Sequence, residues 1–167
     1  MAVEDPVSDA ALFVDGFLRG ALQQEISRVD KCLTDGDMII ADVDAIVKDV
    51  QSGFNLLALI GDIGRLMTDI PTSIRNCQDL PDTIKSTFQN WTNKIKDPVT
   101  IALIVYKALS QYKQELISDA NEFLNDFKTG QYELSGEKLG DIPHTLFDKC
   151  SVSEQVTSMV KELLNDE

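Results

Sequence analysis

The sequence predicts an all-α protein, a bundle of six to eight helices that run mainly up and down. Apolar residues recur at steps of three and four along nearly the whole chain, an aspartate stands one or two residues before each of the five prolines, and no segment reads as a strand. The 167 residues suit one domain. We therefore expect a single helical domain over 1–167, with 1–5 flexible and a C-terminal helix over 151–167.

The first part of the chain predicts three helices. An apolar stripe at helical spacing marks the first, and its members are Ala11, Val14, Leu18, Leu22, Ile26, Val29 and Leu33. Asp35 and Gly36 are expected to end it. A second stripe, from Ile39 to Val50, ends at Gly53. The third helix, about 54–67, is apolar on most sides and should therefore be central.

Each proline lies close behind an aspartate, a pattern typical of helix starts. Proline is tolerated in the first turn because its missing N–H would be unpaired there. Aspartate near the N-cap accepts a backbone N–H and suits the positive helix end. The pattern predicts five helix starts, at Asp5-Pro6, Asp69-Ile70-Pro71, Asp79-Leu80-Pro81, Asp97-Pro98 and Asp141-Ile142-Pro143.

Two further helices complete the expected bundle. The longest follows Asp97 and ends at Gly130. The last starts at the capping box Ser151-Val152-Ser153-Glu154. Its apolar side chains are expected to be buried, and they are Val156, Met159, Val160 and Leu163.

Charge and hydropathy exclude several classes of partner. The net charge of −13 repels phosphate backbones and anionic lipid, which argues against nucleic-acid binding. No run of 18 apolar residues occurs, so we expect no membrane span. The N-terminus has neither a basic flank nor an apolar core, so either the protein is cytoplasmic or its signal peptide has been removed.

The residues needed for catalysis or metal binding are scarce. His144 is the only histidine, and a surface role suits it at a helix start. Metal sites built on two histidines are excluded within one chain. No pair of carboxylates is set apart in an apolar pocket, as general acid–base work would require. We expect a non-enzymatic protein with no catalytic residue, metal or cofactor.

Glycines occur in three pairs at helical spacing: Gly16 with Gly20, Gly61 with Gly64, and Gly136 with Gly140. A glycine inside a helix costs about 1 kcal/mol relative to alanine, so a local benefit is expected. That benefit is either close helix packing or a cavity in which a ligand approaches bare backbone. The candidates for a ligand cavity are Gly16, Phe17, Gly20, Gly61, Gly64 and Tyr106.

Three cysteines and one sequon bear on the compartment. Outside the cytosol, three cysteines fit one internal disulfide and one free or intermolecular thiol; in the cytosol, they fit three reduced, buried thiols. Cys32 and Cys77 both lie near expected helix ends, where chains turn and meet. A bridge between them would leave Cys150 as the free or intermolecular thiol. Asn90 begins an N-x-T glycosylation triplet.

Several segments resemble those of small secreted all-helical proteins of single-celled eukaryotes. They are FVDGFLRG, Cys32 at the end of the first helix, Cys77 after the third helix, DPVT opening the long helix and GQYELSGEKLG after it. Cys150 and the C-terminal helix depart from this pattern. The resemblance implies a removed signal peptide and a Cys32–Cys77 bridge, and it implies no activity.

These observations favour a secreted or lumenal helical binding module, disulfide-bonded and glycosylated. It would associate with another protein or carry an apolar small molecule or pigment between helices. One alternative is a structural subunit of a larger assembly or filament, a homo-oligomer among them, joined partly through Cys150. Another is an intracellular helical adaptor.

Overall fold

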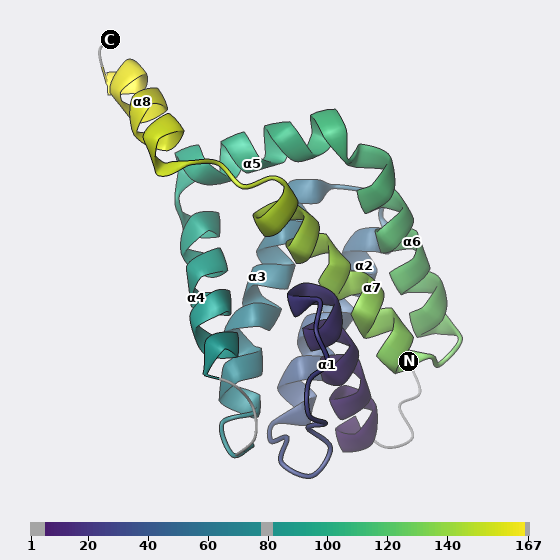
Figure 1. Ribbon diagram of the computed structural model, residues 1–167. Helices are drawn as coiled ribbons and strands as arrows, with labels where there is room; N and C mark the ends of the chain where they lie inside the picture. Colours follow the sequence, from purple (N-terminus) through teal and green to yellow (C-terminus); the bar gives the residue numbers. More distant parts are fainter. Residues whose placement is uncertain (1–5, 78–81, 166–167) are drawn as a thin grey trace.

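The computed structural model describes residues 6–77 and 82–165, which hold eight α-helices and no strand (Figure 1). The helices are α1 (Pro6–Leu22), α2 (Gly36–Gln51), α3 (Leu56–Ser73), α4 (Thr83–Lys96), α5 (Pro98–Gln111), α6 (Lys113–Lys128), α7 (Tyr132–His144) and α8 (Glu154–Asn165). A short π-helix, Thr145–Lys149, continues α7. The all-α prediction is confirmed. The flexibility expected of residues 1–5 lies outside the described residues.

Helix α1 packs against α7, and this is the most extensive contact between helices. Helix α7 also packs against α6, while α2 contacts α1 and α3, and α3 contacts α4. Figure 1 shows α5 crossing one end of the bundle between α4 and α6, which breaks the up-and-down pattern there. Aromatic rings run through the core from Phe17 to Phe88, Trp91 and Phe147, with ring centroids 6.0, 5.8 and 5.2 Å apart.

The backbones of α1 and α7 touch at two glycine pairs, Gly16 with Gly20 and Gly136 with Gly140. A Cβ on Gly16 would collide with the backbone carbonyl of Glu133, and a Cβ on Gly136 would collide with that of Phe13. Both obstacles are backbone atoms, which cannot move without separating the helices. These glycines therefore permit close packing, and no ligand fits between them.

The first helix ends eleven residues earlier than expected, at Leu22. Gln23 adopts a left-handed φ of 56°, and its side-chain amide donates to the carbonyl of Gly20 and to Asp141. Residues 23–35 are irregular, yet Val29 is fully buried and donates its N–H to the carboxylate of Asp15 at 3.0 Å. The apolar stripe thus continues into a loop that side-chain contacts hold against the core.

A disulfide between Cys32 and Cys77 ties this loop to the end of α3, with their Cα atoms 5.1 Å apart. Beside it, Thr34 donates its N–H to the carbonyl of Ser73 at 2.8 Å. The predicted bridge is confirmed. It closes a segment that contains the last residues of the loop, α2 and α3.

The proline pattern was only partly right as a marker of helix starts. Pro98 opens α5, and Asp97 accepts the N–H of Val99 at 3.2 Å. Helix α1 begins at Pro6. Pro71 and Pro143 instead lie in the last turns of α3 and α7. Neither proline opens a helix, and after Pro143 the π-helix Thr145–Lys149 continues α7. The Asp79-Leu80-Pro81 start lies outside the described residues.

The single long helix expected from Asp97 to Gly130 is broken at Tyr112. Tyr112 has φ −129° and ψ 14°, which lie outside the helical region and separate α5 from α6. The break turns the chain from the end of the bundle down along α7 (Figure 1). Leu116, Phe123 and Phe127 of α6 are then buried.

Asp42 of α2 is buried against α3, which gives the fold a defined pH dependence. Burial, together with a hydrogen bond and charge repulsion from Asp69, raises the pKa of Asp42 from the ordinary 3.8 to about 7. Between pH 4 and pH 7 the folded state therefore holds more protons than the unfolded state, and stability falls as pH rises through that range. Burial also raises the pKa values of Asp15, Asp119 and Asp141.

We expect the Asp42→Asn variant to be more stable than the parent at pH 8, by on the order of 2 kcal/mol, and nearly unchanged at pH 4. The amide removes the buried negative charge and can donate to Asp69. Urea unfolding at both pH values measures this difference. Asp37→Asn, on the exposed side of α2, serves as the control. An Asp42→Asn profile parallel to that of the parent would contradict the assignment.

Candidate interaction surface

The residues expected to line a ligand cavity do not converge. Phe17 is in the core, next to the touching backbones of α1 and α7. Gly61 is exposed on α3. A Cβ added to Gly64 would lie 3.3 Å from the side chain of Ile95. Tyr106 is 74% exposed on α5. The expectation of a cavity at these positions is therefore corrected: Gly16 and Gly20 serve packing, and Gly61, Gly64 and Tyr106 lie on other parts of the fold.

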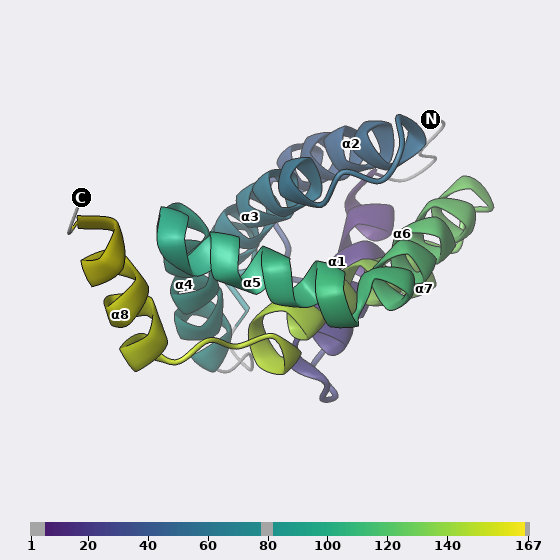
Figure 2. The same ribbon diagram turned by 90° about the horizontal axis from the view of Figure 1, so that it is seen from above.

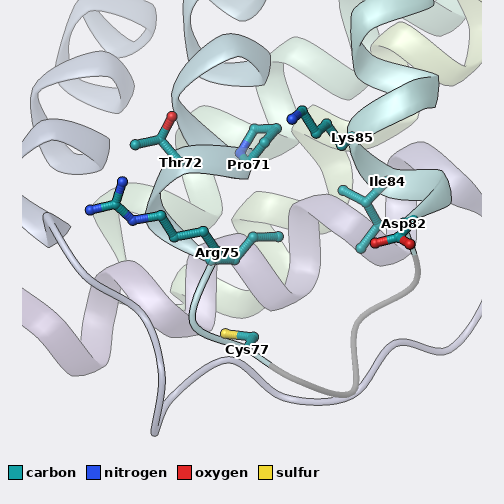
Figure 3. Close-up of a pocket in the computed structure, with 8 residues that line it drawn as sticks. Pro71, Thr72, Arg75, Cys77, Asp82, Ile84 and Lys85 are labelled. Carbon is teal, nitrogen blue, oxygen red and sulfur yellow. The ribbon is translucent and has the colours of Figure 1, made fainter.

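An open hollow of about 350 Å³ lies where α3 ends and α4 begins (Figure 3). Its lining residues are Pro71, Thr72, Ile74, Arg75, Cys77, Asp82, Ile84 and Lys85. The three charged side chains, Arg75, Asp82 and Lys85, are all solvent-exposed. A small-molecule site usually holds a few buried polar groups in an apolar enclosure, and this hollow does not have that arrangement.

Helix α8 begins one residue after Ser153, whose hydroxyl accepts the N–H of Val156 at 3.2 Å. The cap is therefore Ser153, two residues later than the predicted capping box at Ser151. Figures 1 and 2 both show α8 outside the bundle, beside the start of α5 and the end of α4. None of the residues Glu154–Asn165 is buried.

The polar side of α8 faces its own chain. Thr157, Ser158 and Lys161 line a hollow of about 390 Å³ together with Asn93 of α4 and other polar residues. Lys161 forms an ion pair with Asp97 at 2.8 Å across this hollow. Close to the other end of the helix, Lys107 of α5 donates to the carbonyl of Ser151 at 3.5 Å. These contacts set which side of α8 points inward.

The apolar side of α8 faces solvent, which corrects the expectation that it is buried. Val156 is 40% exposed, Met159 55%, Leu163 65% and Leu164 63%. Val160 is half-buried. A helix on the surface of a monomer normally turns this side toward the core. Here the opposite side, which carries Lys161 and its ion pair with Asp97, faces the chain.

Helix α5 adds to the exposed apolar area. Its sequence, PVTIALIVYKALSQ, contains one charged residue, yet only Ile104 and Ala108 are buried. Tyr106 and Leu109 project from its outer side, and α5 contacts α8. We call the exposed apolar side chains of these two helices the α5–α8 surface: Tyr106, Leu109, Val156, Met159, Leu163 and Leu164. They are six of the eight large hydrophobic side chains that are exposed in the described parts of the chain.

Three further candidate groups are His144, Cys150 and Asn90. His144 is half-buried and bonds to Asp148 at 2.8 Å on the same turn. Within 6–77 and 82–165, no three histidine, cysteine or acidic side chains come together to hold a metal. Cys150 is free and completely buried, and burial raises the pKa of its thiol. Of the two roles expected for Cys150, a free or an intermolecular thiol, the structure shows the free thiol. Asn90 is exposed on α4.

Comparison with known families gives one match. The sequence model of the SctB-like family, described as Secreted protein B-like, matches residues 2–148. The chain belongs to this family. Membership of the SctB-like family supports the resemblance to small secreted proteins, although not the expected organism group. Helix α8 lies beyond the matched residues.

No curated protein and no solved structure matches the chain. Among the helices of the described residues, none has the length and apolar character needed to cross a membrane. SctB-like membership and the α5–α8 surface are therefore the two findings from which a function is argued.

Proposed function

We propose that this SctB-like protein is a secreted, non-enzymatic module that associates with another protein chain through the α5–α8 surface. The observation that carries the proposal is the orientation of α8. Its polar residues Ser158 and Lys161 face its own chain, while Met159 and Leu163 face solvent. Exposed apolar side chains gathered on neighbouring helices are a feature of interaction sites in soluble proteins.

Two further observations support a location outside the cytosol. The family is one of secreted proteins, and the Cys32–Cys77 disulfide suits an oxidising compartment. Carriage of a small molecule has less support than protein association. The glycine pair Gly16 and Gly20 meets backbone instead of open space, and the larger hollows are open to solvent.

A photo-reactive amino acid at position 159 tests the association directly. In the culture medium of the source organism, this position should cross-link to a second protein chain. The same group at position 158, on the inward side of α8, should cross-link within its own chain. Cross-linking from 159 to nothing but its own chain would refute the proposed function.

Secretion makes a separate prediction about covalent state. Protein taken from the medium should have a mass two hydrogens below that of the fully reduced chain, and in a glycosylating host it should also carry sugar on exposed Asn90. Asn90→Gln should remove the sugar and leave the disulfide. Three reactive thiols in native material would contradict the secreted assignment.

A further inference from the structure

We propose that the α5–α8 surface binds a second copy of this chain, with α8 of each copy lying on the outer side of α5 of the other. The inference rests on the proposed function and specifies which protein chain binds the α5–α8 surface. Val156, Met159 and Leu163 of one copy would cover Tyr106 and Leu109 of its partner, and the reverse. The contact is self-complementary, as twofold symmetry requires.

Neither apolar face can cover the other within one chain in this arrangement. The ion pair between Lys161 and Asp97 and the bond from Lys107 to Ser151 place α8 along α5 with its polar side inward. Met159 is 55% exposed and Tyr106 is 74% exposed, so neither is covered within the same chain. A second copy supplies both missing surfaces at once.

Charge favours this occupant over the others. Residues 94–113, which contain α5, hold four lysines and one aspartate, a net charge of +3 in a chain of −13. Residues 154–165, which form α8, hold two glutamates and one lysine, a net charge of −1. Pairing α8 with α5 of another copy brings opposite charges together, whereas pairing α8 with α8 opposes like charges. Anionic lipid would attract the α5 region but be repelled by α8.

Twofold symmetry also increases the area that the interface buries. Each contact uses one side of α8, a helix of 12 residues, and stable protein interfaces bury at least about 1,200 Å² in total. Two symmetry-related contacts double the area that one helix provides. A single contact between α8 and an unrelated protein would bury only half of this area.

Sedimentation equilibrium on the full disulfide-bonded chain tests the inference. The parent should show a monomer–dimer equilibrium, and Leu163→Glu and Tyr106→Glu should each weaken the dimer at least tenfold. Leu57→Glu, which changes an equally exposed leucine on α3, should leave the dimer intact. Because all three positions are exposed, thermal melts at equal concentration of monomer should coincide and exclude misfolding as the cause.

Mixing the two variants distinguishes the pairing. Tyr106→Glu retains an intact α8 and Leu163→Glu retains an intact α5, so a mixed dimer keeps one of its two contacts intact. The mixture should therefore associate more strongly than either variant alone and more weakly than the parent. Full dimerisation of Tyr106→Glu by itself would overturn the inference, because it would indicate α8 paired with α8. A parent chain that stays monomeric at a protein concentration close to millimolar would also overturn the inference.

The two proposals fail in different ways. A monomeric parent whose position 159 still cross-links to a different protein would leave the proposed function standing and refute the second copy as partner. A monomeric parent whose position 159 cross-links to its own α5 would refute both, because α8 would then fold back over its own chain.

Discussion

Replacing Cys32 and Cys77 with serine should lower the free energy of unfolding by about 4 kcal/mol. The two cysteines are 45 residues apart, and the bridge restricts the unfolded chain over that distance. It also holds residues 23–35, which have no regular structure of their own, against the end of α3. Urea unfolding of the variant and the oxidised parent measures the difference.

Reductant provides the control for this prediction. The parent in reductant should unfold at the same urea concentration as the double variant, while the variant itself should not respond to reductant. Cys150 is buried and free in both proteins, so it contributes equally. Equal stability of the oxidised parent and the variant would show that the loop is held by its other contacts.

Placing alanine at both Gly16 and Gly136 should cost about 3 kcal/mol or more. Each new Cβ would meet backbone atoms of the opposite helix, so α1 and α7 would have to move apart. The expected loss is large because this is the most extensive helix contact in the fold. Thermal or urea unfolding measures it.

Gly61→Ala is the matched control, since Gly61 is also inside a helix but has nothing within 4 Å of an added Cβ. This change should be neutral or should stabilise the protein by up to about 1 kcal/mol. A double variant as stable as the parent would show that the α1–α7 contact tolerates separation, contrary to its close packing.

The sequence allowed the helical class and several local features to be predicted, because these depend on neighbouring residues. The cap at Asp97 and the end of α2 near Gly53, which has a φ of 112°, follow from local chemistry. Apolar spacing also identified Val29 as a core residue. It could not show that Val29 lies in a loop, because burial there depends on Asp15, fourteen residues away.

The candidate surface was harder to predict, because it depends on which side of α8 faces the bundle. Apolar spacing correctly placed Met159 and Leu163 on one side of a helix. Burial of that side was then assumed, as is usual for a monomer. On the inward side of α8, Lys161 contacts Asp97, which is 64 residues away in the sequence. No local sequence pattern predicts a contact over that separation. The glycine pairs likewise indicated a close approach without identifying α1 and α7 as the partners.

The rate of methionine oxidation by peroxide tests most directly whether the α5–α8 surface is covered in the functional protein. Met159 is 55% exposed in the isolated chain, Met38 is half-buried and Met67 is 1% exposed, so the last two serve as internal references. In protein from its native medium, Met159 should oxidise more slowly than Met38, and in the Leu163→Glu variant it should become the fastest of the three. Met159 oxidising fastest in the native material as well would show that this surface has no partner, and would contradict the account.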